Sequence, residues 1–250
     1  MSMIRINSTS RGKEIKESLN KLFNLKVSSH VSPGGSMESI ANQAQRDITN
    51  IDGSGLCIFV AGLPDLTERE KDYEENYEEV VYTRETPKET SYRLDSIYAN
   101  ASSIVKEEGW TPIFCTIIPM SLTDWNNTRL AQNKTHYLLH HNHYEDMQYH
   151  LNLAVELSNK SIVAINRSNH VHTPYLHNTI IKVDHQKHTY KFNRLVDGVH
   201  PNKAVLEQMS KIIYNAIKAN IIKQKNSIFT GNFLTIPVGE CVEENVEDYW

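Results

Sequence analysis

Residues 56–61 have the sequence LCIFVA and are apolar at every position. An uninterrupted apolar run of this length is typical of a strand that is buried on both faces of a sheet. Four further strands are expected, at residues 3–6, from residue 25 onward, at 112–118 and at 162–165. Because strands buried on both faces occur mainly in parallel sheets, the pattern predicts a parallel sheet with helices on both sides.

Amphipathic segments separate these strands. Ser36 is the expected N-cap of the helix after the second strand, and Gly109 is expected to end the helix before the fourth. Apolar residues recur at helical spacing at 15–23, 39–51, 94–105, 144–157 and 205–217. Helices between parallel strands make right-handed crossovers, so the sequence predicts a three-layer α/β/α domain with a five-stranded parallel sheet in flavodoxin-like order.

Ligands of such sheets bind beyond the carboxyl ends of the strands. Four loops are therefore candidates for a functional site: residues 7–8, 32–35, 62–65 and 196–202. Their sequences combine small, polar and turn-forming residues, as expected of loops that approach a ligand closely.

Composition narrows the classes of function. The formal net charge of −4 disfavours nucleic-acid binding through general positive charge. The only feature in favour of nucleic-acid binding is the group of Lys218, Lys223 and Lys225 near the end of the last helix. There is no run of 18 apolar residues, and the first residues lack the apolar core of a signal peptide. Three cysteines, Cys57, Cys115 and Cys241, cannot all pair, so we expect reduced thiols and a protein of the cytoplasm or the nucleus, with the cytoplasm preferred.

The strongest local signal lies before the last helix, where residues 196–202 have the sequence VDGVHPN. Asp197 precedes His200 by three residues, so its carboxylate can accept the imidazole Nδ1–H and stabilise the imidazolium. A histidine held in this way serves as a general base for a nucleophile, and Ser8 stands at the end of the first strand. The alternatives are a purely structural turn at residues 197–200 and a Ser8 that only caps a helix starting at Ser10.

Together with the strand order, this pattern resembles the SGNH (GDSL-like) hydrolase family over residues 3–219. In that family a Gly-Asp-Ser follows strand one, a Gly follows strand two, a Gly-x-Asn-Asp follows strand three, and an Asp-x-x-His pair precedes the last helix. The resemblance implies a serine-dependent ester hydrolase without a cofactor, acting on small esters, lipids or glycans. It makes Ser8 the nucleophile, His200 the general base and Asp197 its orienter. The N–H groups of Ser8 and Gly34 would bind the oxyanion, with Arg11-Gly12 matching the Arg-Gly that often follows the serine.

The chain departs from the family at three positions. Ile6 and Asn7 stand for the Gly and Asp before the serine, and Pro64 stands for the Asn that donates to the oxyanion. Proline has no donor, and loss of one oxyanion donor costs about 10²–10³ in rate. The second hypothesis is therefore a catalytically degenerate domain that binds or assembles, like the SGNH-like domains found in proteins of viruses and retroelements.

Two stretches lie outside the alternation. Residues 67–90 form an acidic insertion, with nine acidic and four basic residues between 68 and 89. We expect a solvated loop or helix, or an acidic surface for a protein partner. The tail at 223–250 ends EENVEDYW and either frays or docks on a partner or on its own domain.

Eleven of the twelve histidines lie between residues 136 and 200. His136 and His140 have the spacing of one helical face, which is a possible metal-binding arrangement. No His-Glu-x-x-His or Cys-x-x-Cys accompanies them. The sequence therefore predicts structural histidines and no metal site.

Overall fold

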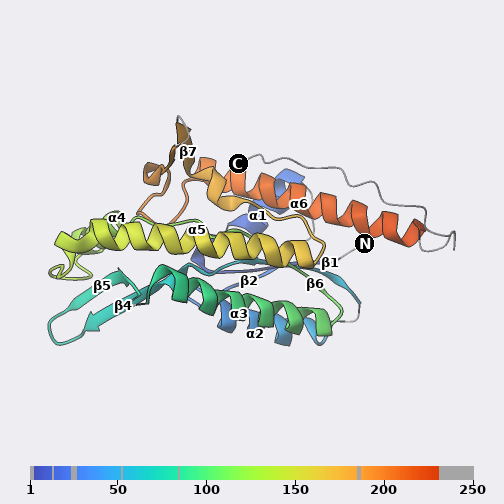
Figure 1. The fold of residues 1–250 in the computed structure, drawn as a ribbon, viewed down its shortest axis with the longest axis horizontal. Coiled ribbons are helices and arrows are strands. Elements are labelled where there is room, and N and C mark those ends of the chain that lie inside the picture. The colour runs from blue at the N-terminus through green and yellow to red at the C-terminus, as the bar shows by residue number, and fades with distance from the viewer. Residues whose placement is uncertain are drawn as a thin grey trace.

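The computed structural model describes residues 3–12, 14–23, 27–51, 53–83, 85–184 and 187–230. Its centre is a four-stranded parallel sheet in the order β2-β1-β3-β6 (Figure 1). The strands are β1 (Met3–Ser8), β2 (Ser28–Val31), β3 (Gly55–Val60) and β6 (Thr111–Phe114). β1 pairs with β2 on one side and with β3 on the other, and β6 forms the far edge.

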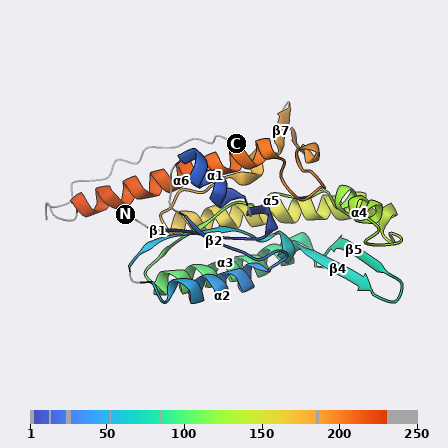
Figure 2. The same ribbon diagram turned by 180° about the vertical axis from the view of Figure 1, so that it is seen from behind.

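Helices cover both faces of the sheet. α1 (Ile15–Phe23) and α6 (Lys203–Thr230) lie above it in Figure 1, and α2 (Met37–Ile48) and α3 (Pro87–Glu107) lie below, as the view from behind also shows (Figure 2). The two apolar clusters follow the pleat of the strands: Ile4, Ile6 and Ile58 pack against α1 and α6, while Cys57 and Phe59 pack against α2 and α3. The prediction of three α/β/α layers is confirmed.

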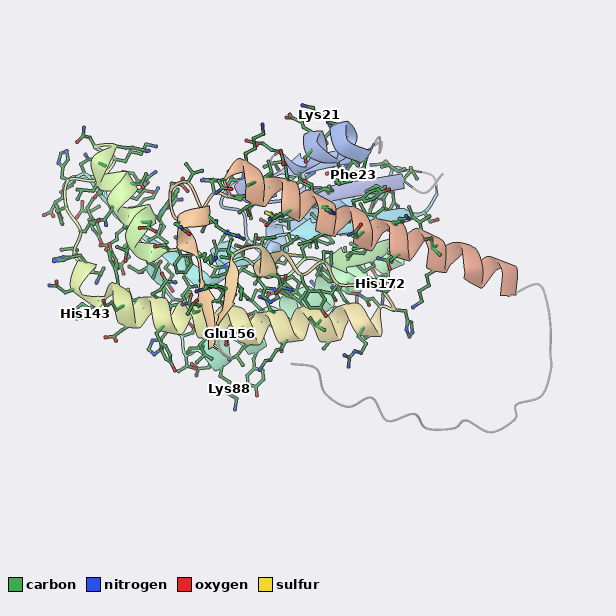
Figure 3. The ribbon with its side chains drawn as sticks, turned by 90° about the horizontal axis from the view of Figure 1, so that it is seen from above. Lys21, Phe23, Lys88, His143, Glu156 and His172 are labelled. Atoms are coloured by element: carbon green, nitrogen blue, oxygen red, sulfur yellow. The ribbon has the colours of Figure 1, made fainter. Side chains whose placement is uncertain are left out.

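α1 and α6 contact each other on their shared face. The ring of Phe23 stacks on that of Tyr214 with centroids 4.0 Å apart, and Figure 3 shows Phe23 between the two helices. α6 runs through residue 222, so the expected domain boundary falls within a helix. The rest of the expected tail, residues 231–250 with Cys241, lies outside the described residues.

The predicted fifth strand is wrong. Residues 162–165 belong to α5 (Tyr144–Ser168), which continues eleven residues beyond the predicted end at 157. Neither Gly nor Pro interrupts this helix, and Leu151, Val155 and Ile162 are buried along one side of it. A short apolar run cannot be distinguished from a buried helical segment by its periodicity alone.

α5 lies along the β6 edge of the sheet and satisfies its backbone groups. The side chain of Asn166 accepts from the Phe114 N–H at 3.0 Å and donates to the Phe114 carbonyl at 2.7 Å. Asn159 makes the same pair of contacts with Ile117, at 2.6 and 3.1 Å. Two amide side chains therefore bind the backbone where a neighbouring strand would otherwise pair.

Most of the acidic insertion is a hairpin of two strands and not the expected loop or helix, and only its last residues, 87–90, belong to a helix, α3. β4 (Thr67–Asp72) and β5 (Tyr77–Tyr82) form an antiparallel hairpin that projects from the body in Figure 1. Most of β4 is exposed, whereas β5 is buried against α5 and α4 (Leu122–Ala131). The sequence did not predict α4 or the second hairpin, formed by β7 (Ile181–Asp184) and β8 (Lys187–Tyr190).

Most other predicted boundaries agree with the structure to within four residues, but α3 begins seven residues before the predicted residue 94 and α6 ends thirteen residues after the predicted residue 217. The Ser36 side chain caps α2 by accepting from the Ser39 N–H, as expected. β1 extends to Ser8 instead of ending at residue 6, and this difference decides the identity of the candidate nucleophile below. No helix in the described ranges has the length and apolar character needed to cross a membrane.

Candidate active site

Three of the four candidate loops meet at one cleft of about 660 Å³, and residues 9–10 take the place that was expected for residues 7–8, which are buried in the sheet. The cleft lies where β1, β2 and β3 end, as expected for a parallel sheet. Each loop contributes two residues to the lining: Thr9 and Ser10, Pro33 and Gly34, Leu63 and Pro64, Val199 and His200. The remaining wall comes from the hairpin and from the region of α4: Thr67, Glu68, Arg69, Val80, Met120 and Trp125.

Asp197 and His200 interact as the sequence suggested. His200 Nδ1 lies 2.7 Å from Asp197 Oδ2, and Asp197 Oδ1 accepts the N–H groups of Val199 at 3.0 Å and His200 at 2.8 Å. Burial opposes the charge on Asp197, but the hydrogen bonds from His200 and Val199 outweigh it and hold the pKa of this carboxyl below its usual value. The carboxylate is therefore charged at neutral pH and fixes the imidazole with Nε2 facing away from it.

The serine that meets this imidazole is Ser10. Its Oγ lies 3.1 Å from His200 Nε2, which completes a serine–histidine–aspartate chain of hydrogen bonds. Ser10 belongs to a single 3-10 turn, Ser10–Gly12, directly after the strand and is partly exposed to the cleft.

The expectation that Ser8 meets His200 is wrong. Ser8 is the last residue of β1, is fully buried, and its hydroxyl has no hydrogen-bond partner. Ser8 follows Ile4 and Ile6 on the pleat and faces α1 and α6. It is packed so closely against Gly12 that a Cβ added at Gly12 would lie 2.4 Å from the Cβ of Ser8. The strand is two residues longer than predicted, so the loop that carries the candidate nucleophile starts two residues later.

The same shift moves Ile6 and Asn7 out of the site. Ile6 is a fully buried core residue, and the Asn7 amide donates to the Sγ of Cys57 at 3.2 Å inside the sheet. Neither one crowds or supports the nucleophile. Ser8-Thr9-Ser10 then takes the place of Gly-Asp-Ser, and the adjacent Arg11-Gly12 is the sequence signal that could have fixed this register.

Two further cleft residues bear on oxyanion binding. Gly34 has a φ of +69°, and nothing lies within 4 Å of the position a Cβ would take there. Among the described backbone hydrogen bonds the Gly34 N–H has no acceptor, whereas the neighbouring Gly35 N–H binds the Ser32 carbonyl at 3.0 Å. Pro64 lines the cleft in the 3-10 turn Leu63–Leu66 and offers no donor.

Asp65, next to Pro64, joins two loops of the site. Its Oδ2 accepts the Met37 N–H at 2.9 Å, at the start of α2, and Arg93 donates to its carbonyl oxygen at 2.9 Å. Burial raises the pKa of Asp65 to about 6, although the Met37 hydrogen bond and the Arg93 charge act in the opposite direction. Asp65 is thus a structural link beneath the cleft.

Trp125 is a cleft residue that sequence reasoning missed. Its ring centroid lies 6.0 Å from that of His200, tilted by 56°. It is carried by α4, whose local signal was Ser121: the Ser121 hydroxyl caps the helix by accepting from the Asp124 N–H. Nothing in the sequence placed that helix beside the residue 196–202 loop.

His136 and His140 do not share a helical face, because the chain between α4 and residue 141 is irregular. His140 Nε2 instead lies 3.0 Å from Glu70 Oε2 on β4. Within the described residues no three His, Cys, Asp or Glu side chains gather as a metal site would require.

Comparison with known proteins adds a structural match. No family model matches the chain, and no curated protein resembles it in sequence. A GDSL-like lipase from Bacteroides thetaiotaomicron VPI-5482 matches with a TM-score of 0.59 and 14% identity, covering 88% of this chain and 89% of that one. This chain has the SGNH hydrolase fold.

Other SGNH-fold structures match over similar lengths. A member of the lipolytic protein G-D-S-L family from Veillonella parvula DSM 2008 has a TM-score of 0.55 and 10% identity, with 87% of this chain and 99% of that one covered. The psychrotrophic esterase EstA from Pseudoalteromonas sp. has a TM-score of 0.50 and 9% identity, with coverages of 88% and 99%. At these identities the likeness establishes the fold.

Proposed function

We propose that this chain is a serine-dependent ester hydrolase with Ser10 as nucleophile, His200 as general base and Asp197 as the residue that orients His200. The observation that carries the proposal is the hydrogen-bonded chain from Ser10 Oγ through His200 to Asp197 at the floor of an open cleft. These residues come from opposite ends of the sequence and meet in the geometry that nucleophilic catalysis requires.

The reaction follows from these contacts. His200 Nε2 removes the proton from Ser10 Oγ while that oxygen attacks the ester carbonyl, and Asp197 stabilises the imidazolium that results. The imidazolium then gives its proton to the alcohol oxygen, so that the C–O bond breaks and the alcohol leaves an acyl-serine. A water molecule, deprotonated by the same Nε2, attacks the acyl-serine and releases the acid and the free Ser10 hydroxyl.

The oxyanion of the tetrahedral intermediate would be bound by the N–H groups of Ser10 and Gly34. The open surroundings of Gly34 and its unoccupied N–H support this role. Pro64 cannot supply a third donor, so we expect a rate about 10²–10³ below that of a site with three donors.

The substrate class is a small ester, with the acyl and alcohol parts drawn from lipids or glycans. The cleft lining combines apolar side chains with Glu68, Arg69 and Thr9, and the SGNH-fold neighbours include a lipase and an esterase by name. A cytoplasmic location remains part of the proposal. It is consistent with the buried free thiols of Cys57 and Cys115, since burial raises the pKa of Cys57 to about 12 and also raises that of Cys115.

The test compares two serines that lie two residues apart. Ser10→Ala should lower the hydrolysis of 4-nitrophenyl acetate to the uncatalysed background and abolish covalent labelling by a fluorophosphonate. Ser8→Ala should retain the activity and the labelling, because its hydroxyl contacts neither His200 nor the cleft. A structure of the neighbour EstA is described as inhibited by monoethylphosphonate, which makes a phosphonate probe a suitable reagent. Equal activity of wild type and Ser10→Ala would refute the proposal.

Pro64 favours one second candidate, a catalytically degenerate domain that binds or assembles. In that case folded wild-type protein would remain unlabelled by the fluorophosphonate and would self-associate or bind a protein partner, for instance through the acidic hairpin. Labelling at Ser10 would exclude this candidate.

A further inference from the structure

One wall of the cleft belongs to α4 and carries an aromatic side chain beside the catalytic imidazole. Trp125 lines the cleft and is partly buried against the core on its inner side. Its ring lies at 6.0 Å from the His200 ring, and the Arg129 guanidinium lies over the Trp125 ring, 5.8 Å from its centroid. An indole in this position is within reach of a group on the His200 side of the cleft, and its ring is a flat apolar surface for such a group to contact.

Backbone contacts fix the position of Trp125 relative to His200. The Ser121 N–H donates to the Gly198 carbonyl at 2.9 Å, which joins the start of α4 to the loop between Asp197 and His200. Gly198 has a φ of +81°, and a Cβ there would lie 2.7 Å from the Trp125 backbone nitrogen. The loop and the helix therefore contact each other at backbone distance, and Trp125 keeps one place beside the imidazole.

Ion pairs hold the outer side of this wall. Glu78 on β5 binds the Arg129 guanidinium through one carboxylate oxygen and the Arg69 Nε, at 3.2 Å, through the other. Arg129 is thus tied to the hairpin while it covers Trp125. The aromatic surface is supported by α4, by the residue 196–202 loop and by β5.

The path of the proton in the proposed reaction indicates which part of the substrate lies beside Trp125, and this inference rests on the proposed function. His200 gives its proton to the alcohol oxygen, so the alcohol must lie on the His200 side of the attacked carbon. The oxyanion, by contrast, would point toward the N–H groups of Ser10 and Gly34. We propose that Trp125 binds the alcohol part of the ester and selects alcohols that present a flat apolar face, either an aromatic ring or the CH face of a sugar ring.

The test uses esters that share one acyl group and differ in the alcohol. In the 250-residue chain, Trp125→Ala should lower kcat/KM about tenfold for 2-naphthyl acetate, for an acetylated methyl glucoside, or for both, and change that for ethyl acetate less than twofold. The two ring substrates distinguish an aromatic from a sugar alcohol. Trp125→Phe should retain most of the selectivity, and Trp125→Leu, which keeps apolar bulk without a flat ring, should lose it if Trp125→Ala does not fold.

Leu130→Ala is the matched control, because Leu130 lies on the same helix, is exposed and does not line the cleft. Its kcat/KM should equal the wild-type value for every alcohol. A loss of equal size for ring and ethyl esters in the Trp125 variants would overturn the proposal, as would a loss that follows the length of the acyl chain instead of the alcohol.

A binding measurement separates this proposal from the proposed function. The Ser10→Ala protein cannot form an acyl-enzyme, so calorimetry measures its affinity for the intact esters. Adding Trp125→Ala should weaken binding of at least one ring ester about tenfold and leave ethyl acetate unchanged. If wild type shows no Ser10-dependent hydrolysis while this difference persists, the esterase proposal fails and the Trp125 site stands. Equal affinity of the single and double variants would overturn the Trp125 site, whatever the activity.

Discussion

Ser8 and Ser10 have the same side chain and lie two positions apart, yet their surroundings differ completely. The Ser8 carbonyl accepts the Ser32 N–H at 2.8 Å, and the next residue still donates to the Val60 carbonyl, so β1 remains in the sheet through Thr9. The pleat turns the Ser8 hydroxyl toward the apolar core, where it has no partner. Ser10 follows after the chain has left the sheet, and its hydroxyl meets His200. The end of the strand thus decides which serine meets His200.

Pro64 is the residue that most limits the proposed catalysis. We expect Pro64→Asn to raise kcat for 4-nitrophenyl acetate by up to about 10²-fold, since an amide donor at this position would stabilise the oxyanion alongside the N–H groups of Ser10 and Gly34. KM should change little, because the added interaction forms mainly in the transition state. Steady-state kinetics of the two proteins measures both quantities.

The control for this gain is Pro64→Ala, which relieves the proline constraint without adding a side-chain donor. An equal increase in kcat for the Ala and Asn variants would show that backbone freedom, and not the amide, produced the effect. No increase in the Asn variant would contradict the assigned position of the oxyanion.

At the scale of elements, the sequence predicted those parts whose signals are local. The apolar strands, the helices at residues 15–23 and 144–157 and the Asp197–His200 motif were each recognisable within one short window. To identify the candidate nucleophile, the end of β1 must be located to better than two residues. The periodicity of apolar residues does not locate strand ends that accurately. The α4 wall with Trp125 depends on contacts between α4, the hairpin and the last loop, and no single window of sequence contains them.

The sequence of α5 contains a repeat of asparagines that indicates one long helix. Asn152, Asn159 and Asn166 recur every seven residues, so they lie on one side of the helix, and two of them bind backbone groups that a fifth strand would otherwise pair. Polar amides repeated along an apolar helix face indicate buried partners. This spacing favours one long helix over the predicted helix and strand.

We expect Asn166→Ala to lower the free energy of unfolding by about 2–4 kcal/mol, because both the N–H and the carbonyl of Phe114 would lose a buried partner. Asn152→Ala is the control: Asn152 is only partly buried and its side chain accepts from Gln148 alone among the described hydrogen bonds, so the loss should stay below about 1 kcal/mol. Urea denaturation followed by circular dichroism measures both values. Equal losses in the two variants would contradict the role of Asn166 at the β6 edge.

At the scale of the whole molecule, Asp65 connects the site to global stability. This carboxyl lies beneath the cleft, 8% exposed, and links the loop after β3 to the start of α2. Its pKa of about 6 in the folded chain is higher than the ordinary value of 3.8, mainly because of burial. Between these two values the folded chain holds a proton that the unfolded chain has released, so Asp65 makes the free energy of unfolding decrease as pH rises.

The rise of the Asp65 pKa from 3.8 to about 6 corresponds to about 3 kcal/mol in the free energy of unfolding. We therefore expect the wild-type free energy of unfolding, relative to that of Asp65→Asn, to be greatest below pH 4, to fall by about 2–3 kcal/mol between pH 4 and pH 7 and to level off above pH 7. The asparagine oxygen can still accept the Met37 N–H, and the variant cannot titrate at this position. Urea denaturation of both proteins at pH 4, 5, 6 and 7 measures the difference, in which the other titrating groups cancel. A difference that does not change with pH would mean that Asp65 ionises in the folded chain as it does in the unfolded one, and that the link between β3 and α2 is open to water.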